Sequence, residues 1–261
     1  MDNCLILGCG RSGTSLMAGI LNEAGYYNGD NLYNARYSNP MGFYENWEIN
    51  SINEAILNTY ITKTLKIKRK ITNKSTIDSP CRGHFWLFRI DPQVKISYRN
   101  KKIIKRISSL VLHQPFAFKD PRFSYTVSVW KDYLPVNTKF VVVFRDPSIT
   151  ANSIVKECKS AEYLSNMYID YNLALQSWAS IYLHIMKNYL LDKDSYIFIH
   201  YEQILSTAAL PKLSKFLDTS LTDNFVDKNL RRSVKKEQYI DSITQLYKKL
   251  CILAEYDDRS Y

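Results

Sequence analysis

Short apolar runs alternate along the chain with longer stretches in which apolar residues recur every three or four positions. Continuous apolar runs of this length are typical of buried strands in parallel sheets, and they lie at 4–7, 116–119, 139–144 and 196–200. The longer periodic stretches predict helices at about 14–24, 147–158, 163–190, 209–217 and 238–254. Strands that alternate with helices predict an α/β fold, with a parallel β-sheet flanked by helices.

The segment from about 50 to 110 is the least regular part of the sequence and the most basic. Its cations fall into two runs, Lys63, Lys66, Lys68, Arg69, Lys70 and Lys74, and Lys95, Arg99, Lys101, Lys102, Lys105 and Arg106. No proline- or glycine-rich linker separates this segment from the rest. We therefore predict a single domain over residues 1–261, with a basic helical insertion or cap at about 50–110. A basic run is most often a solvated helix face.

The formal net charge of +10 favours anionic partners. Nucleic acid is not the favoured one, because the basic runs lack the interleaved aromatic residues of a single-strand platform; a basic nucleic-acid-binding protein stays an alternative. No apolar run approaches the length that spans a membrane, and the sequence begins without a leader-type segment. We therefore expect a cytoplasmic protein with no membrane partner. Scattered cysteines and histidines predict no metal site.

A glycine-rich sequence, GCGRSGTS at 8–15, lies between the first predicted strand and the first predicted helix. Glycines permit a tight turn that points backbone N–H groups inward, and the helix that follows adds the positive end of its dipole. This context predicts a phosphate-binding loop and hence a sheet of the P-loop type. Thr14 stands where a nucleoside triphosphatase has its lysine, and the positive charge is at Arg11. A P-loop nucleotide kinase or ATPase is the alternative, although it would need that lysine.

A second anion-binding signature, FRDPSITANS at 144–153, follows the strongest predicted strand. Arg145 leaves the strand at the sheet edge where ligands bind in open α/β folds. Pro147 then begins a helix, and Ser153 lies two turns into it. An arginine and a hydroxyl can bind a phosphate together. Two such sites on adjacent strand ends suit a nucleotide with both 3′- and 5′-anions.

Both signatures, together with NPMGFYEN at 39–46, KDPRF at 119–123 and HYEQIL at 200–205, resemble the sulfotransferases that use 3′-phosphoadenosine-5′-phosphosulfate (PAPS). The likeness is to bacterial-type members and to the protein-tyrosine branch, and it covers roughly residues 1–220. It implies a sulfotransferase-like fold and transfer of a sulfuryl group from PAPS to a hydroxyl or amine. The acceptor would be a carbohydrate or small metabolite, the product adenosine 3′,5′-bisphosphate, and no metal would be required.

The resemblance also implies roles for individual residues. The 3′-phosphate would be bound by Arg145 and Ser153, and Tyr201 would lie near the adenine. The 5′-phosphosulfate would be bound by Arg11, Ser12, Gly13, Thr14 and Ser15. A late glycine- and lysine-rich motif of the cytosolic members is not recognisable, and Arg231 and Arg232 are the candidates to replace it.

In-line sulfuryl transfer requires a base for the acceptor proton and cations around the migrating group. Glu45 matches the glutamate of related branches and is the predicted base, with Asp120 and His113 as alternatives. Lys119 and Arg11 are the predicted cations. A lysine that ends a buried strand has little structural purpose there; the alternative explanation for Lys119 is an ion pair with Asp120. Residues expected to contact the acceptor are Arg122, Asp120 and Tyr44. A non-catalytic nucleotide-binding protein is the remaining alternative.

Overall fold

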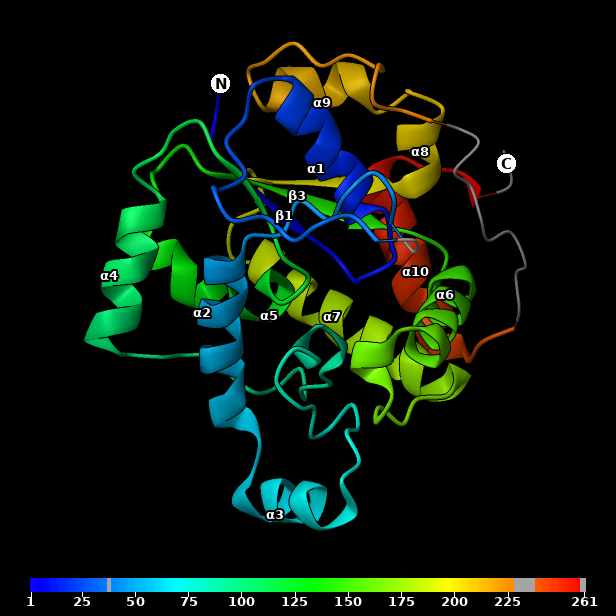
Figure 1. Cartoon of the computed structure of the whole chain (residues 1–261). Helices are drawn as coiled ribbons and strands as arrows, with labels where there is room; N and C mark the ends of the chain where they lie inside the picture. Colours follow the sequence, from blue (N-terminus) through cyan, green and yellow to red (C-terminus); the bar gives the residue numbers. More distant parts are fainter. Residues whose placement is uncertain (37–38, 228–237, 259–261) are drawn as a thin grey trace.

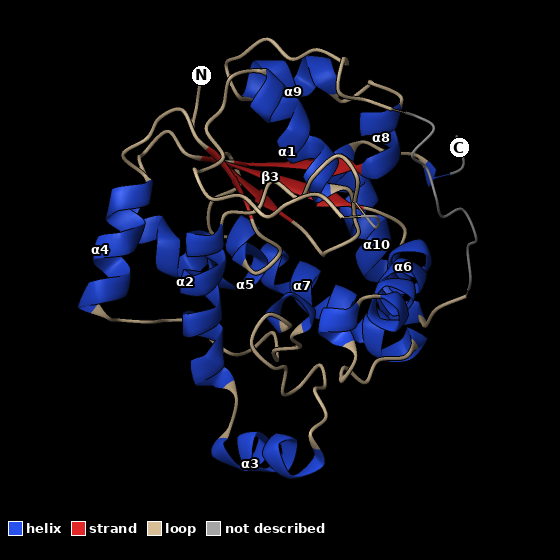
Figure 2. Cartoon of the chain, in the orientation of Figure 1, coloured by secondary structure: helices blue, strands red, loops and turns tan. Residues whose placement is uncertain are grey.

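The computed structural model describes the chain except residues 37–38, 228–237 and 259–261. Four parallel strands form one sheet in the order β2-β1-β3-β4 (Figure 2). The strands are β1 (Cys4–Leu7), β2 (Ala117–Lys119), β3 (Lys139–Phe144) and β4 (Tyr196–His200). The predicted α/β fold and its four strands are therefore confirmed, and Arg231 and Arg232 lie outside the described residues.

Successive side chains of a strand point to opposite faces of the sheet, so each strand contributes to the hydrophobic cluster on either face. Leu5, Leu7 and Phe144 belong to one buried cluster, whereas Ile6 and Val143 belong to the other. Figure 1 shows one group of helices above the sheet and a larger group below it. The upper group is α1 (Thr14–Glu23), α8 (Tyr201–Leu205) and α9 (Leu210–Phe216); the lower group is α2 (Trp47–Leu57), α4 (Lys101–Leu110), α5 (Phe123–Trp130), α6 (Pro147–Ser160), α7 (Tyr171–Tyr189) and α10 (Asp241–Ala254).

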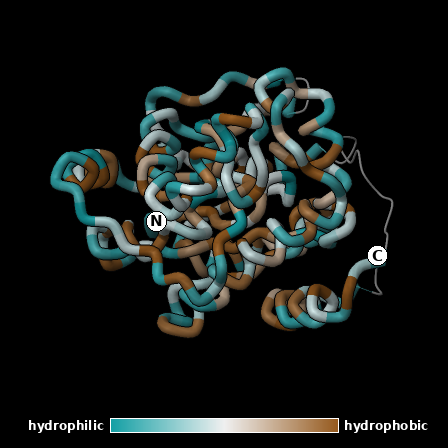
Figure 3. The backbone as a smooth tube through the Cα atoms, turned by 90° about the horizontal axis from the view of Figure 1, so that it is seen from below, coloured by the Kyte–Doolittle hydropathy of each residue, from teal (hydrophilic) through white to brown (hydrophobic). Residues whose placement is uncertain are grey.

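The helices α6 and α2 begin at side-chain caps. The Asp146 carboxylate accepts hydrogen bonds from the N–H groups of Ser148 and Ile149 at 2.8 and 3.0 Å, and Pro147 occupies the first turn of α6. The Asn46 side chain accepts from Glu48 and Ile49 N–H in the same way at the start of α2. Seen from below in Figure 3, hydrophobic and hydrophilic residues alternate along the helices, as expected where one face is buried.

The helix predicted at 163–190 is α7, and it begins eight residues later than expected, at Tyr171. The residues before it instead pair with a distant segment: the Ser75 N–H donates to the Asn166 carbonyl at 2.9 Å, and the Tyr168 N–H donates to the Ser75 carbonyl at 2.8 Å. Asp170 then caps α7 through the Leu173 N–H at 2.8 Å. Hydrogen bonds to Ser75 replace those that a continuous helix would have made.

Most of the basic segment at 50–110 is built into the hydrophobic core. Ile52 and Ile56 of α2, Phe85, and Ile103 and Ile107 of α4 are all buried in the cluster below the sheet. The exception is α3 (Lys63–Thr72), which has no buried residue and stands apart from the other helices in Figure 1. The division of the chain into domains stays a prediction.

Candidate active site

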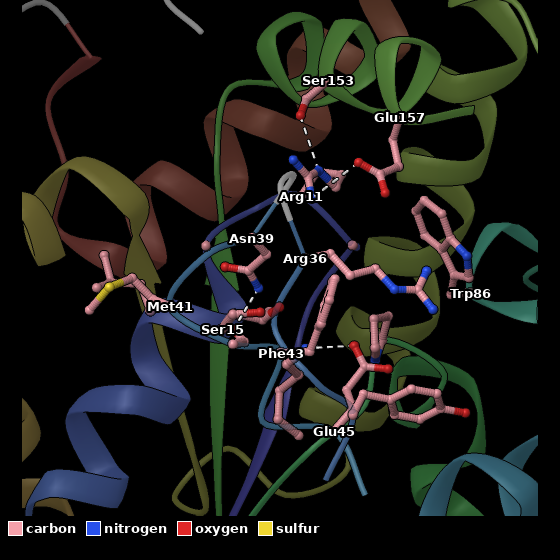
Figure 4. Close-up of a pocket in the computed structure, with 18 of the residues that line it drawn as sticks. Arg11, Ser15, Arg36, Asn39, Met41, Phe43, Glu45, Trp86, Ser153 and Glu157 are labelled. Atoms are coloured by element: carbon pink, nitrogen blue, oxygen red, sulfur yellow. Dashed lines mark hydrogen bonds and ion pairs between the residues drawn. The ribbon is translucent and has the colours of Figure 1, made fainter. Parts of the chain in front are cut away.

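A cavity of about 510 Å³ opens over the carboxyl edge of the sheet (Figure 4). Each strand delivers a lining residue at or just after its end: Arg11 after β1, Lys119 on β2, Arg145 after β3 and Tyr201 after β4. Further parts of the wall come from residues 33–36 and 39–45 and from Gly83 and Trp86. The cavity lies at the edge where open parallel sheets bind ligands.

The glycine-rich loop is held tightly at its start. The Gly8 N–H donates to Ser124 Oγ at 3.1 Å, and the Cys9 N–H donates to the Tyr182 hydroxyl at 3.2 Å. A Cβ on Gly8, where φ is 143°, would lie 2.2 Å from the Val143 carbonyl oxygen, so no larger residue fits there. Of the predicted loop residues, Arg11, Gly13, Thr14 and Ser15 line the cavity, whereas Ser12 is fully buried.

Arg11 joins the loop to the second signature. Its Nε donates to Ser153 Oγ at 3.2 Å, and its Nη1 lies 3.6 Å from Glu157 Oε2 (Figure 4). Ser153 and Glu157 are four residues apart on α6 and therefore share a face. The structure thus brings together two signatures that are more than 130 residues apart in the sequence, and it adds Glu157, which the sequence analysis did not identify.

Arg145 and Tyr201 form the next part of the wall. The Arg145 guanidinium carbon lies 4.3 Å from the centre of the Tyr201 ring, the geometry of a cation–π contact. The same ring covers Gly13, where a Cβ would lie 2.4 Å from Tyr201 Cδ2. Arg145, Tyr201 and the glycine-rich loop are thus contiguous, as the predicted nucleotide-binding roles require.

Glu45 and Lys119 meet as an ion pair at the opposite side of the cavity. Lys119 Nζ donates to Glu45 Oε1 at 2.6 Å, and Asn50 Nδ2 donates to Glu45 Oε2 at 3.3 Å. The Lys119 side chain is 2% exposed and that of Glu45 is 16% exposed. The carboxylate that Lys119 contacts is therefore Glu45 and not Asp120, and the predicted base and the predicted cation lie within one hydrogen bond of each other.

Asp120 and Arg122 form a buried network behind this pair. Arg122 Nη1 donates to Asp120 Oδ1 at 3.0 Å, and Arg122 Nε donates to Glu54 Oε1 at 3.0 Å. Asp120 Oδ2 also accepts from Asn50 and Asn53 of α2 at 3.0 and 3.1 Å. Burial raises the pKa of Asp120, while the Arg122 guanidinium acts to lower it. The network fixes α2, and with it Glu45, against the end of β2.

The other predicted acceptor and base residues lie at different depths. Arg122 reaches the cavity wall although its side chain is 4% exposed, whereas Asp120 is fully buried. His113 stacks on Tyr27 and precedes β2, so it lies at the amino edge of the sheet, away from the cavity. Tyr44 packs edge-on against Phe225 at 5.8 Å between ring centres. The described lining includes its neighbours Phe43 and Glu45 but not Tyr44.

Several lining residues were not identified from the sequence. The Arg36 guanidinium lies 4.8 Å from the ring centre of Tyr163 and 5.9 Å from that of Phe43. Trp86 covers the glycine-rich loop so closely that a Cβ on Gly10 would lie 2.6 Å from its ring. Glycine at position 10 was the available signal, since close approach of another group often explains a glycine. In the described part of the chain, no group of three histidine, cysteine or acidic side chains is arranged to bind a metal.

The chain is thus an α/β protein with a glycine-rich loop between β1 and α1, arginines after two strand ends and a cavity over the carboxyl edge of its parallel sheet. Residues 4–223 match the sequence profile of the Sulfotransferase family. The chain therefore belongs to the sulfotransferase family.

Solved structures show the same fold at low sequence identity. The sulfotransferase domain from the curacin biosynthetic pathway is 15% identical, with a TM-score of 0.52 and 98% of each chain covered. The sulfotransferase domain of the Synechococcus PCC 7002 olefin synthase is 15% identical, with a TM-score of 0.53, 98% of this chain and 94% of the other covered. Sulfotransferase STF9 from Mycobacterium avium is 11% identical, with a TM-score of 0.50 and coverages of 98% and 77%. No curated protein sequence matches the chain.

Proposed function

We propose that this sulfotransferase takes a sulfuryl group from PAPS and transfers it to a hydroxyl or amine of a carbohydrate or small-metabolite acceptor. The observation that carries the proposal is the contact of Arg11 with Ser153, at 3.2 Å, across two strand ends. This contact makes one continuous anion-binding wall from the glycine-rich loop, Arg145 and the first turns of α6. A donor that carries anions at both its 3′- and 5′-ends would use the whole length of that wall.

The residues of this wall fit such a donor. Gly10 and Gly13 have no room for a side chain because Trp86 and Tyr201 lie directly over them, which leaves backbone and ring surfaces facing the cavity. Thr14 and Ser15 begin α1, whose N-terminus favours an anion. Arg11, Thr14 and Ser15 would bind the 5′-phosphosulfate, Arg145 and Ser153 the 3′-phosphate, and Tyr201 the adenine. When bound, PAPS supplies an activated sulfuryl group whose leaving group is adenosine 3′,5′-bisphosphate.

Glu45 and Lys119 would carry out the chemistry on the far side of the cavity. Glu45 has one carboxylate oxygen on Lys119 and the other on Asn50, so its orientation is fixed while its side chain stays partly exposed to the cavity. It would accept the proton of the acceptor hydroxyl. Lys119 is a buried cation at the wall and would stabilise negative charge on the migrating group, together with Arg11.

The acceptor would lie among aromatic rings. Tyr33, Phe43, Trp86 and Tyr163 line the same cavity as Glu45. Flat aromatic faces can bind the apolar faces of sugars and small ring compounds.

Thermal stabilisation by nucleotides tests the donor. Adenosine 3′,5′-bisphosphate without magnesium should raise the melting temperature, because a ligand that binds only the folded state stabilises it by mass action. ATP should raise it much less. Equal shifts with the two nucleotides, or a strict need for magnesium, would favour a P-loop kinase or ATPase. Transfer of label from ³⁵S-PAPS to a panel of hydroxylated acceptors then tests the reaction.

A further inference from the structure

The two basic runs look alike in the sequence but differ in the structure. In α4 the apolar positions Ile103 and Ile107 are 7% and 0% exposed and belong to the core below the sheet. The α4 lysines Lys101, Lys102 and Lys105 are exposed on its other face. This run is therefore the solvated face of an ordinary amphipathic helix.

In α3 the apolar side chains are exposed instead. Ile67 and Ile71 are 51% and 80% exposed, and they are one helical turn apart, so they form one outward face. Lys63 lies four residues before Ile67 and Lys70 lies three residues after it, which places a lysine beside the pair on the same face. The inward side is fixed to the body, where Ser79 Oγ donates to the Leu65 carbonyl at 3.3 Å and Arg69 donates to the Pro80 carbonyl.

The charge of α3 is of one sign only. Residues 63–74 contain six lysines and arginines and no aspartate or glutamate. A partner for this face must therefore be anionic, and it must also accept two isoleucine side chains. Nucleic-acid backbones would satisfy the lysines and leave the isoleucines in water. An anionic bilayer surface offers negative headgroups and an apolar layer directly beneath them, which is the environment that basic amphipathic helices occupy.

We infer that α3 docks peripherally on anionic phospholipid surfaces, with Ile67 and Ile71 entering the headgroup region and the surrounding lysines contacting phosphates. No described helix is long and apolar enough to cross a bilayer. The expectation of no membrane partner rested on the lack of a membrane-spanning segment. That criterion does not address binding to a membrane surface. The segment that holds α3 at Ser79 and Pro80 continues along the chain to Gly83 and Trp86, which line the cavity.

Vesicle sedimentation of the full chain tests this inference. Phosphatidylcholine vesicles that contain phosphatidylglycerol should bind the protein at least about tenfold more tightly than pure phosphatidylcholine vesicles, and added salt should weaken the binding. The triple variant Lys63→Glu/Lys70→Glu/Lys74→Glu should lose about tenfold or more. The double variant Ile67→Ser/Ile71→Ser, which keeps the charge, should lose several-fold because the apolar contribution is removed.

The matched control is Lys101→Glu/Lys102→Glu/Lys105→Glu on α4, which changes the net charge by the same amount. It should keep vesicle binding within about threefold, since α4 has no exposed apolar pair. Equal losses of vesicle affinity in the two triple variants would mean that net charge alone explains the binding, and would overturn the inference. A wild-type protein that binds neutral and anionic vesicles equally would overturn it too. Binding of an RNA oligonucleotide that depends on α3, without vesicle binding, would assign the helix to nucleic acid instead. Every substituted side chain is exposed, so all variants should keep the wild-type melting temperature.

Discussion

The two sides of the cavity are built in different ways. On the donor side, which comprises residues 8–15, 145–157 and Tyr201, each functional group belongs to a short motif at the end of a strand. On the acceptor side, which comprises residues 33–36, 39–45, 83–86, 119–122 and Tyr163, the groups come from segments far apart in the sequence and are held by contacts between those segments. Glu45 and Lys119, for example, are 74 residues apart in the sequence.

Under the proposed function, this difference would separate donor binding from chemistry. The donor side is placed largely by glycine geometry and strand ends, and Ser124 and Tyr182 also hold the start of its glycine-rich loop. The acceptor side depends on the buried network of Asp120, Arg122 and Glu54, which fixes α2 and so Glu45. Substitutions on the donor side should therefore change affinity for the nucleotide, whereas substitutions on the acceptor side should change turnover.

The largest effect is expected from Glu45→Gln. We expect kcat to fall by roughly 10²–10⁴, the range for loss of a general base, while affinity for adenosine 3′,5′-bisphosphate stays near the wild-type value. The glutamine oxygen can still accept a hydrogen bond from Lys119, so the shape of the site is retained. Steady-state kinetics with a hydroxyl acceptor and calorimetry with the bisphosphate provide the two measurements.

Glu48→Gln is the matched control for this change. Glu48 lies three residues further along, on the surface, and pairs with Arg106 at 3.0 Å. Its neutralisation should leave kcat and nucleotide affinity unchanged. A folded Glu45→Gln enzyme with near-normal kcat would refute the assignment of the base. Parallel losses of kcat and nucleotide affinity would instead break the division between the two sides.

The same division explains how much of the fold the sequence predicts. The strands were predicted correctly because buried parallel strands are short continuous apolar runs, and their shortness and β-branched residues favour strand over buried helix. The long helix was extended too far, because Tyr163 and Tyr168 continue the helical spacing of aromatic residues. What ends that pattern is the pairing of the 166–168 backbone with Ser75, a contact that no local pattern contains.

In the cavity, the proposed donor residues all stand in motifs that the sequence displays, whereas the proposed acceptor side also contains residues of no motif. Glu45 and Lys119 each stand in a recognisable motif, but their ion pair follows from the way α2 packs on β2. Arg36, Trp86 and Tyr163 belong to no motif and reach the cavity only through the fold. Residues whose place depends on contacts between distant segments escape a sequence analysis for this reason.

The next largest effects concern the donor anchors. Arg11→Ala and Arg145→Ala should each weaken binding of adenosine 3′,5′-bisphosphate by roughly 2–4 kcal/mol, because each removes a charge-assisted partner from a desolvated phosphate. This loss corresponds to about 30- to 700-fold in Kd, measured by calorimetry on folded protein. Arg106→Ala, which removes a surface arginine, is the control and should bind normally. Wild-type affinity in either variant would exclude that arginine from the donor site.

The smallest effect, and the finest test of the donor wall, is expected from Ser153→Ala. The Ser153 hydroxyl accepts from Arg11 Nε at 3.2 Å and faces the cavity. Removing it deletes one hydrogen bond to a charged group and no charge, so affinity for the bisphosphate should fall by about 1.5–3 kcal/mol at most. Adenosine 5′-phosphate separates its two possible contributions. If Ser153 binds the 3′-phosphate directly, only the bisphosphate should bind more weakly. If Ser153 acts by orienting Arg11, binding of both nucleotides should weaken alike.

Ser160→Ala is the matched control, because Ser160 also lines the cavity on α6 but its hydroxyl donates to carbonyls of its own helix, at 3.0 Å to Lys156 and 3.3 Å to Glu157. Equal losses in the serine variants at 153 and 160 would mean that the first turns of α6 contribute no specific phosphate contact, and the continuous wall from Arg11 to Arg145 would have to be abandoned.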